Sequence, residues 1–592
     1  MNWKQSLSTL MFTALCALPL SAVTAEKTDA FNKSACSGSS CPKYAKYDYI
    51  IVGNGSAGSI LARKLTDDLK TTVLVLEDGI NHADDPVVLD PNPFSSFIET
   101  LTLYINPLYA RTYPTGITGA FQTYSEGRGW GGSSAHNFML AVRGTPGIYD
   151  GWAAASGNPI WGYDALLPYM KALETYTSNG GPVNTNQRGT DGPIKISQFP
   201  PVNPAAGAPN PSLSTVIANT DGIGYMDDYN DYTTGILGVT PNQLFVTPPA
   251  LSEESHRSYS ALEFLTPNVV TPEGRGVNGR KLRIESNTWA SRVLFKGNKA
   301  IGIEFISNNG RSKVLKAYGK QIILCAGAIQ TPALLQRSGV GDAELLNSLN
   351  IPVVVNNPNV GANLINQYGA GVITFVPPAY QPPVIASSSF INGFPYVGTA
   401  NEQVRRLELL TENFGPGAGG SVVIEFLPFI LEPKSRGNIQ IVSTDPLIPP
   451  LVNLNMYSDG PATPGQPIAD PTDLDLTVAG YRIVNDIIQA IPGAGIINIP
   501  ADYFNDPTNQ LLASLASQGS IPEDHITGTT RMSTSIADGV VDGNLRVWGT
   551  QNLMIVDLGA VPVIPDGNTC YCVYVLALRA AALLGVPTPP AL

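Results

Sequence analysis

One of the four histidines in this 592-residue chain lies in a stretch whose residue types suit acid–base chemistry. His525 stands in IPEDHITGTT, between the carboxylates of Glu523 and Asp524 and a turn of threonine and glycine. An imidazole that titrates near neutrality can take a proton from a substrate at physiological pH. A solvated histidine in a polar turn would have the same local sequence, so the role of His525 depends on what the rest of the chain places around it.

A glycine pattern near the start of the chain predicts a dinucleotide site. Residues 47–58, YDYIIVGNGSAG, join an apolar strand to a helix through Gly53, Gly55 and Gly58. Gly53 permits the tight turn, Gly55 lets the backbone approach a pyrophosphate, and Gly58 lets the helix pack on the strand. The unpaired N–H groups at the helix start then face the anion. A second strand, TTVLVLE, ends at Glu77, about 20 residues further on, where a carboxylate can bind ribose hydroxyls. A glycine-rich strand–helix turn without a ligand is the alternative.

A second glycine cluster, SEGRGWGGSSAHNFMLAVRGT at 125–145, follows the first. Its glycines leave backbone amides uncovered, and Ser133 and Ser134 add hydroxyl groups. Such a loop can lie against a phosphate or a flat ring, but a hairpin turn could have the same composition. The pattern of Gly53, Gly55 and Gly58 alone does not distinguish an NAD site from an FAD site.

Length and charge restrict the classes of protein that remain. The chain is too long for one simple core, so we expect two domains or one elaborated domain. A net charge of −12 argues against a nucleic-acid partner, which requires a basic face. Residues 1–25 resemble a secretory signal peptide, followed by a flexible segment at 26–43 with a glycosylation pattern at Asn32. No later apolar stretch is long enough to span a membrane, so we expect a secreted protein with no membrane partner.

The cysteines add little chemistry. Cys36 and Cys41 lie in a Ser/Gly segment and could form a small disulfide bond in an oxidising compartment. Cys325, in the apolar run QIILCAGA, is predicted to be a buried thiol. Cys570 and Cys572 lack the second ligand pair of a zinc site, so no metal is expected.

The two glycine-rich stretches, together with segments near the C-terminus, resemble the glucose–methanol–choline (GMC) oxidoreductase family of flavoproteins. YDYIIVGNGSAG is similar to the family's FAD fingerprint, and GRGWGGSSAHNFM to its second signature. KQIILCAGAIQTPALLQRSGVG, SRGNIQIVSTDPLIPP, DHITGTTRM and NLMIVDLGAVPVIPDGNT resemble later family segments, in the same order. The resemblance runs from about Tyr47 to Leu584, so it is specific for the family and nearly uninformative about the substrate.

The resemblance implies an α/β fold like that of glucose oxidase. A Rossmann-like FAD-binding domain is combined with an α+β substrate domain that has a mostly antiparallel sheet. The FAD-binding domain would be discontinuous, and the substrate domain would fill the intervals. The expected FAD-binding pieces are 44–145, 276–345 and 521–590, and the expected substrate-domain pieces are 146–275 and 346–520. From the residues alone, KLRIESNTWASRVLFKGNKAIGIEFI alternates like paired strands joined by a Gly-Asn turn.

The resemblance also gives His525 a role. The family's H-x-x-G-T pattern, which carries its catalytic histidine, matches His525-Ile526-Thr527-Gly528-Thr529, and the second catalytic position falls on Asn568. Alcohol oxidation removes the hydroxyl proton while hydride leaves carbon for the flavin. His525 would take the proton, and Asn568 would donate a hydrogen bond to the developing alkoxide.

The remaining flavin contacts are implied by position. Val293 would meet the adenine, and Asp557 and Ala560 would lie near the pyrophosphate and ribityl chain. The expected FAD-binding residues are Gly53, Asn54, Gly55, Ser56, Ala57, Gly58, Glu77, Trp130, Gly131, Gly132, Ser133, Ser134, His136, Asn137, Phe138, Val293, Asp557, Ala560, Asn568 and Thr569.

The other three histidines have less defined roles. His136 occupies the place where choline oxidases attach FAD covalently, and the alternative is a histidine packed near the flavin ring. His82 is predicted to lie in a surface loop, and His256 to be structural.

The sequence therefore predicts a secreted FAD-dependent oxidase or dehydrogenase that acts on a small-molecule alcohol. A primary alcohol on a small aromatic, furanic or aliphatic molecule, or on a secondary metabolite, is the expected substrate, and a sugar is the alternative. Oxygen or a quinone would reoxidise the flavin. The alternative is a non-redox relative, a hydroxynitrile lyase or a biosynthetic cyclase, that retains FAD. The presence of both His525 and Asn568 favours the redox function.

Overall fold

The computed structural model describes residues 46–91, 105–111, 121–199, 212–249, 252, 254–307, 313–381, 387–464 and 467–587. The predictions for the signal peptide (1–25), the segment 26–43, Asn32, Cys36 and Cys41 lie outside the described residues.

A parallel sheet lies at the centre of the predicted dinucleotide region. Its strands run in the order β9 (Leu282–Glu285), β2 (Val73–Leu76), β1 (Lys46–Val52), β12 (Lys313–Leu324) and β24 (Leu553–Ile555), and every neighbouring pair is parallel. The short apolar runs of β2, β1, β24 and the end of β12 are buried on both faces, as the central strands of a parallel sheet require, whereas β9 alternates buried and half-buried residues. Helix α2 (Ser56–Leu65) connects β1 to β2.

An antiparallel hairpin extends this sheet. β10 (Thr288–Lys296) pairs with β11 (Lys299–Ser307), and β11 pairs with the first half of β12. The turn falls on Gly297 and Asn298, so the paired strands and Gly-Asn turn predicted from the sequence are confirmed.

Helices from distant parts of the chain cover the parallel sheet. The C-terminal helix α13 (Cys570–Leu583) is buried on nearly all sides and contacts α2 and α6 (Tyr163–Leu173). Helix α8 (Ser260–Phe264) also contacts α2. Side chains of α5 (Pro146–Ser156), α6 and α8 join the same apolar core as the sheet.

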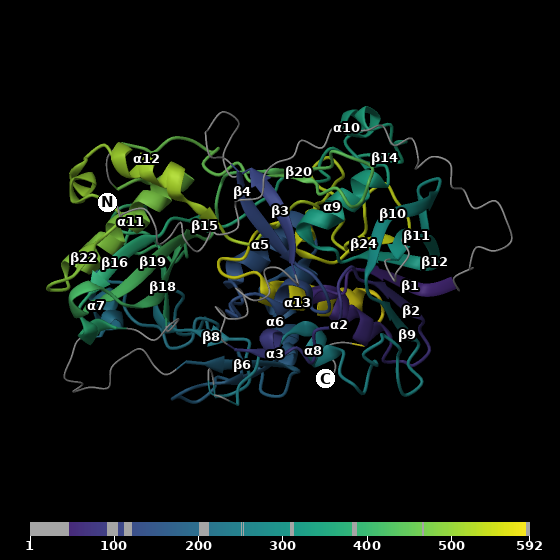
Figure 1. The fold of residues 1–592 in the computed structure, drawn as a ribbon, viewed down its shortest axis with the longest axis horizontal. Coiled ribbons are helices and arrows are strands. Elements are labelled where there is room, and N and C mark those ends of the chain that lie inside the picture. Colours follow the sequence, from purple (N-terminus) through teal and green to yellow (C-terminus); the bar gives the residue numbers. More distant parts are fainter. Residues whose placement is uncertain are drawn as a thin grey trace. The chain divides into compact units, whose positions relative to one another are not determined.

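A second, antiparallel sheet is formed mainly by residues 368–522. Its order is β22 (Gly495–Ile496), β16 (Val372–Val376), β19 (Val422–Ile430), β18 (Leu407–Pro416), β17 (Ser387–Ile391) and β7 (Gly238–Pro241), with β15 (Tyr368–Gly369) and β23 (Ile521–Pro522) at the side. Helix α11 (Asp473–Gln489) contacts β19, as Figure 1 shows, and starts at a capping box of Thr472 and Asp475. Helix α12 (Gln510–Gly519) contacts α11.

The two faces of this antiparallel sheet pack in different cores. Leu409 of β18 and Phe426 of β19 belong to the core that includes α11, whereas Leu410 and Phe429 belong to the core of the parallel sheet. Alternate side chains of a strand point to opposite faces, so the sheet lies between α11 and the parallel-sheet region.

Smaller elements complete the described part of the chain. A four-stranded sheet joins β3 (Ile105–Arg111) and β4 (Phe121–Gly127) to β20 (Asn438–Gln440) and β21 (Leu451–Asn453). The remaining helices are α3 (Pro86–Leu89), α7 (Leu213–Asn219), α9 (Gly327–Arg337) and α10 (Ala343–Ser348), and the remaining strands are β5 (Glu174–Thr177), β6 (Ile194–Gln198), β8 (Gln243–Leu244), β13 (Val340–Gly341) and β14 (Val355–Asn356).

The predicted fold class is confirmed: a Rossmann-like α/β region is combined with a mostly antiparallel sheet. Tyr44–Leu592 form one compact unit. Within 146–275, β7 and α7 pack with the antiparallel sheet, whereas α5, α6, β6 and α8 pack in the core of the parallel sheet. The division into an FAD-binding and a substrate domain at the stated boundaries stays a prediction. Within the described ranges, no helix has both the length and the apolar composition needed to cross a membrane.

Candidate active site

The three glycines after β1 have different surroundings. Gly53 has a φ of +94°, and a Cβ added there would lie 2.4 Å from the carbonyl oxygen of Cys325. A Cβ on Gly58 would lie 2.0 Å from the carbonyl oxygen of Gly53. A Cβ on Gly55 would meet only Gly132 Cα, at 3.8 Å. Gly53 and Gly58 are therefore required for packing, whereas the backbone of Gly55 faces free space into which a ligand can approach.

The N-terminus of α2 opens into the same space. Gly55, the N-cap residue, has no side chain to cap the helix, and the first turn carries no acidic residue. Gly55, Ser56 and Ala57 line a cavity that runs along the carboxyl ends of the parallel strands. The unpaired N–H groups of a helix start attract an anion, and this edge of a parallel sheet is where such folds bind dinucleotides.

Glu77 closes one part of the cavity at the end of β2. Its Oε2 accepts a hydrogen bond from the amide of Asn54 (2.7 Å), and its Oε1 accepts from the amides of Gly79 and Gly129 (both 2.9 Å). These bonds tie both glycine loops to one carboxylate. Because a carboxylate has about four lone-pair positions, Glu77 retains capacity for a ribose hydroxyl.

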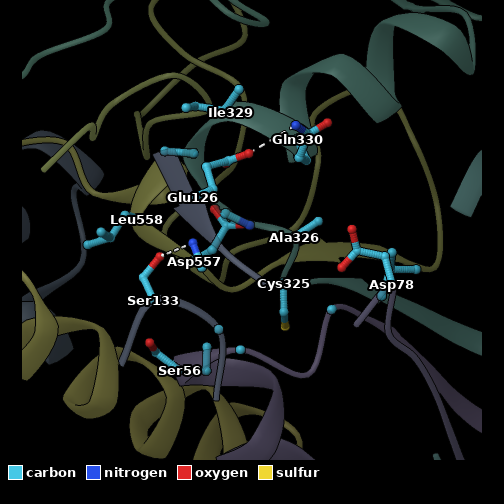
Figure 2. Close-up of a pocket in the computed structure, with 18 of the residues that line it drawn as sticks. Ser56, Asp78, Glu126, Ser133, Cys325, Ala326, Ile329, Gln330, Asp557 and Leu558 are labelled. Atoms are coloured by element: carbon cyan, nitrogen blue, oxygen red, sulfur yellow. Dashed lines mark hydrogen bonds between the residues drawn. The ribbon is translucent and has the colours of Figure 1, made fainter. Parts of the chain in front are cut away.

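The other walls of the cavity come from segments far apart in the sequence. They are supplied by the start of β10 (Thr288, Trp289, Ala290), the turn after β12 (Cys325, Ala326, Gly327), the region around β4 (Tyr124, Ser125, Glu126, Gly127, Gly132, Ser133), and Asp524, Ile526, Asp557 and Leu558. Figure 2 shows Ser56, Ser133, Cys325 and Asp557 around this space. A cavity between two strand–helix turns, with an open glycine backbone and an uncapped helix start, fits FAD.

Eight of the predicted FAD-binding residues line this cavity. They are Gly53, Gly55, Ser56, Ala57, Glu77, Gly132, Ser133 and Asp557. Asp557 caps a short turn: its carboxylate accepts from the Gly559 amide (2.9 Å), the Gly327 amide (3.1 Å) and the Thr331 hydroxyl (2.6 Å). It thereby joins the turn after β24 to the turn after β12.

A second group of predicted residues lies behind the cavity wall. Asn54, Gly58, Trp130, Gly131 and Ser134 are packed into the two glycine loops; for example, the Gly131 amide donates to Asn54 O (2.8 Å) and Ser134 Oγ to Gly131 O (2.6 Å). Asn137, Phe138, Ala560 and Thr569 are also absent from the described lining of the cavity. The side-chain oxygen of Asn137 accepts a hydrogen bond from Arg257. The FAD contacts predicted for these residues stay predictions.

Val293 is absent from the described lining of the cavity. Its side chain is buried in the core, and its amide donates to Ser338 Oγ (2.8 Å). On β10, the cavity is lined by Thr288, Trp289 and Ala290. The contact of Val293 with the adenine stays a prediction.

His82 and His136 lie in contact near the second glycine loop, and the position of His82 differs from the prediction. His82 is buried rather than exposed in a surface loop. Its Nε2 lies 2.8 Å from Arg128 O, and its ring packs edge to face on that of His136, with 5.6 Å between the ring centroids. His136 is buried in this contact and is absent from the described lining of the cavity. Covalent attachment of FAD at His136 stays a prediction.

His525 lies beside the cavity, between the lining residues Asp524 and Ile526. Its backbone amide donates to Asn366 Oδ1 (3.0 Å), and its Nδ1 lies 2.7 Å from Gln367 Oε1. The ring is half-buried, and burial lowers the pKa of His525 to about 4. The imidazole is therefore neutral at physiological pH, the state that a general base requires.

Asn568 is held in the C-terminal loop before α13. The carboxylate of Asp566 accepts from the amide and the hydroxyl of Thr145 (both 2.7 Å), and Pro565 O accepts from Gln367 Nε2 (2.9 Å). The buried Oδ1 of Asn568 has no hydrogen-bond partner among the described residues. A buried amide oxygen of this kind is normally satisfied by a ligand or by water.

Carboxyl groups surround the cavity and His525. Burial raises the pKa of Glu126 to about 8 and that of Asp524 to about 7. Burial, with the neighbouring Asp524, raises the pKa of Glu523 to about 8. These groups thus bind protons near neutrality and limit the negative charge beside the site.

Sequence reasoning missed Gln367, which contacts both the His525 ring and the segment that carries Asn568. It also missed Glu126, Trp289 and the turn at Ala326 and Gly327, all of which line the cavity. The strand-then-glycine pattern of IILCAGA gave a signal for the turn, whereas Gln367 gave none, because its importance comes only from a long-range contact.

Comparisons with known proteins agree with this geometry. The family model described as GMC oxidoreductase matches residues 47–240 and 253–368 with its N-terminal part and 433–577 with its C-terminal part. The oxygen-dependent choline dehydrogenase of Pseudomonas fluorescens is 30% identical, over 88% of this chain and 91% of the relative.

Solved structures show the same fold at lower identity. Pyridoxine 4-oxidase from Mesorbium loti has a TM-score of 0.73 at 24% identity, over 91% of this chain and 99% of that one. A fungal aryl-alcohol oxidase has a TM-score of 0.73 at 21% identity, over 91% and 98%. The glycine loops, the helix start and the cavity agree with these matches: the chain belongs to the GMC oxidoreductase family and is an FAD-dependent oxidoreductase that acts on alcohols.

Proposed function

We propose that this chain is a secreted enzyme that oxidises a small primary alcohol, with His525 as the base that takes the hydroxyl proton. The alcohol group is carried by an aromatic, furanic or aliphatic molecule. Two structurally similar proteins are named for pyridoxine and aryl alcohols, which supports a ring-bearing substrate. Secretion is supported by the sequence of residues 1–25, and Asn32 is the proposed glycosylation site.

One observation carries the catalytic part of the proposal. Gln367 contacts His525 Nδ1 with its oxygen and Pro565 O with its nitrogen, so the histidine segment and the Asn568 loop are held by a single side chain. This shared contact supports the proposal that the imidazole of His525 and the carboxamide of Asn568, from segments distant in sequence, act on one substrate.

The residues divide the chemistry between them. Bound FAD supplies the acceptor for the hydride that leaves the alcohol carbon. His525 takes the hydroxyl proton, so the alcohol becomes an aldehyde after loss of one proton and one hydride. The Asn568 amide donates to the oxygen on which negative charge develops. Gly55 and the start of α2 bind the pyrophosphate, and Glu77 binds the ribose.

His525→Ala tests this role. Anaerobic mixing of the wild-type holoenzyme with a panel of alcohols should bleach the oxidised-flavin absorbance. In the variant, we expect the rate of flavin reduction to fall about 10²–10⁴-fold, because general base catalysis contributes that much. FAD content should not change, since the described lining of the cavity does not include the His525 ring.

The control is His256→Ala, which removes an exposed histidine whose ring contacts Thr247 (3.3 Å). This variant should reduce flavin at the wild-type rate. Wild-type reduction rates in His525→Ala would remove the histidine from its proposed role. Turnover of a substrate while the flavin stays oxidised throughout would favour the lyase or cyclase function.

The pH dependence follows from the same group. Because the pKa of His525 is lowered to about 4, its neutral form persists well below the ordinary titration range of histidine. Protonation of His525 should therefore slow flavin reduction only as the pH approaches about 4, so any change in rate between pH 8 and 6 would report Glu523 and Asp524 instead. Stopped-flow reduction across both ranges measures these changes.

A further inference from the structure

We propose that Gln367 is a positioning residue that fixes the tautomer of His525, with the proton on Nδ1 and the lone pair on Nε2. The inference rests on the proposed function, because a fixed tautomer matters only if His525 acts as a base. It assigns a role to a buried residue that the catalytic step itself does not use.

The backbone of Gln367 is fixed opposite the His525 segment. Ile365 and Thr527 exchange two backbone hydrogen bonds, of 3.0 and 2.9 Å, and the Glu523 amide donates to Gln367 O (2.8 Å). The Gln367 side chain is 1% exposed. It can therefore adopt few positions other than the one beside the imidazole.

The orientation of the Gln367 amide follows from its other partners. Nε2 donates to Leu431 O (2.8 Å) and to Pro565 O (2.9 Å). Backbone carbonyl oxygens only accept hydrogen bonds, so rotating the amide would bring three acceptor oxygens together. The oxygen Oε1 must face His525, at 2.7 Å from Nδ1.

This orientation determines which nitrogen of His525 carries the proton. Oε1 has no hydrogen to donate, so the short contact requires an N–H on Nδ1. In a neutral imidazole the other nitrogen, Nε2, then holds the lone pair. Without Gln367, the tautomer with a proton on Nε2 would become accessible, and that nitrogen could not accept the substrate proton.

The test uses holoenzyme labelled with ¹⁵N-histidine. Only four histidines contribute, so subtraction of the His525→Ala spectrum identifies His525. At pH 7, long-range ¹H–¹⁵N correlation should show a protonated Nδ1 and an unprotonated Nε2. A proton on Nε2 in the wild-type enzyme, or a cationic ring, would overturn the proposal.

Gln367→Met keeps the size of the side chain and removes the acceptor. We expect a detectable fraction of the Nε2–H tautomer and a fall in flavin reduction of about 10–100-fold, the loss typical of removing a partner that orients a functional histidine. In Gln367→Glu, the Leu431 and Pro565 carbonyl oxygens can only accept, so they favour a carboxyl protonated on the oxygen that faces them, and the other oxygen still accepts from Nδ1. This variant should retain the wild-type tautomer and reduce flavin faster than Gln367→Met.

Gln336→Met is the matched control. Gln336 is also 1% exposed, donates from Nε2 to Val360 O (3.1 Å) and Ile439 O (3.0 Å), and accepts from the Ile441 amide (2.9 Å). Its replacement removes an equivalent set of hydrogen bonds without touching His525. If Gln336→Met slowed reduction as much as Gln367→Met, or if Gln367→Met kept the wild-type tautomer, the positioning role would be rejected.

The outcomes separate this inference from the proposed function. The spectrum reports the tautomer whether or not the enzyme turns over any alcohol, whereas His525→Ala reports whether the histidine matters for reduction. If Gln367→Met does not accumulate as folded protein, the wild-type and Gln367→Glu spectra still decide the assignment.

Discussion

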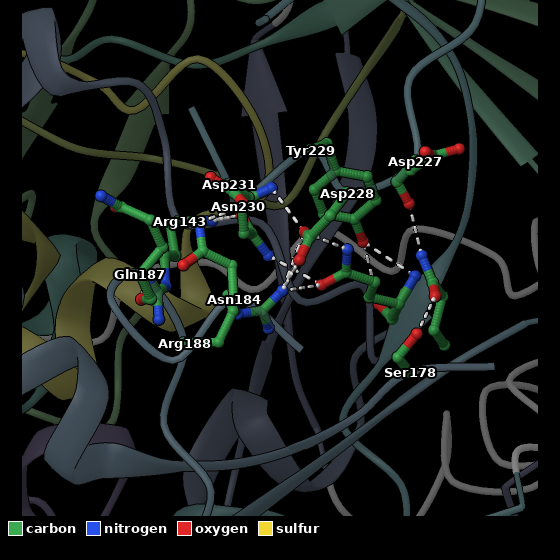
Figure 3. A network of polar contacts seen from close by, with 12 residues as sticks. Arg143, Ser178, Asn184, Gln187, Arg188, Asp227, Asp228, Tyr229, Asn230 and Asp231 are labelled. Carbon is green, nitrogen blue, oxygen red and sulfur yellow. Dashed lines mark hydrogen bonds and ion pairs between the residues drawn. The ribbon is translucent and has the colours of Figure 1, made fainter. Parts of the chain in front are cut away.

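Two buried polar regions of this molecule differ in how their groups are satisfied. Glu174, at the start of β5, accepts from Arg143 (2.7 Å), Arg188 (2.8 Å), Tyr571 (2.8 Å) and the Gly189 amide (3.0 Å). Arg188 also binds Asp228, as Figure 3 shows for part of this network. Burial alone would raise the pKa of Glu174, but Arg143 and Arg188 hold it below its ordinary value.

In the active-site region, several buried polar atoms lack hydrogen-bond partners within the described part of the chain. The buried Asn568 Oδ1, Asn366 Nδ2 and Asn54 Nδ2 have no hydrogen-bond partner among the described residues. The charges of the Glu174 cluster are thus satisfied by one another, whereas Asn568 Oδ1, Asn366 Nδ2 and Asn54 Nδ2 can each form a further hydrogen bond with a ligand or with water.

Glu174→Ala should have the largest effect on stability. It leaves two guanidinium groups buried without their shared carboxylate, which costs about 3–5 kcal/mol of unfolding free energy. Denaturant unfolding measures the loss. The control Arg292→Ala breaks an exposed pair with Glu304 and should cost less than about 1 kcal/mol. Equal losses in the two variants would remove the distinction between buried and exposed ion pairs.

Asn568→Ala should impair catalysis rather than stability, the opposite of Glu174→Ala. We expect flavin reduction to slow about 10²–10³-fold, the cost of removing one donor to a developing oxyanion. Unfolding stability should change little, because Oδ1 makes no hydrogen bond that would be lost. Stopped-flow reduction and thermal unfolding measure the two quantities. A large stability loss with unchanged reduction would make Asn568 structural.

Gly55→Ala and Gly58→Ala compare function with packing inside one motif. A methyl group on Gly55 enters the open cavity, so we expect FAD binding to weaken by about 1–3 kcal/mol while the apoprotein keeps its stability. A methyl group on Gly58 meets the carbonyl oxygen of Gly53 and should destabilise the fold itself. Fluorescence titration of apoprotein with FAD, and unfolding of each variant, test both expectations. Unchanged FAD affinity in Gly55→Ala would place the pyrophosphate elsewhere.

Local patterns predicted the parts of the molecule that depend on neighbouring residues. The strand, glycine turn, helix and second strand between Tyr47 and Glu77 form as expected, because each contact lies within one short segment. The β10–β11 hairpin was predicted for the same reason. An error arose where another segment intervenes: the region around Arg128 buries His82, which was predicted to lie in a surface loop.

The family, the fold class, the dinucleotide turn and the residue types available for alcohol oxidation could all be inferred from the amino-acid sequence. The contact of Gln367 with both the imidazole and the Asn568 loop could not, because Gln367 lies 158 positions before His525 and meets it only in the folded chain. The physical reason is that glycine turns follow from local backbone sterics. The direction of an imidazole proton instead depends on an acceptor that another part of the chain must bring within hydrogen-bond distance.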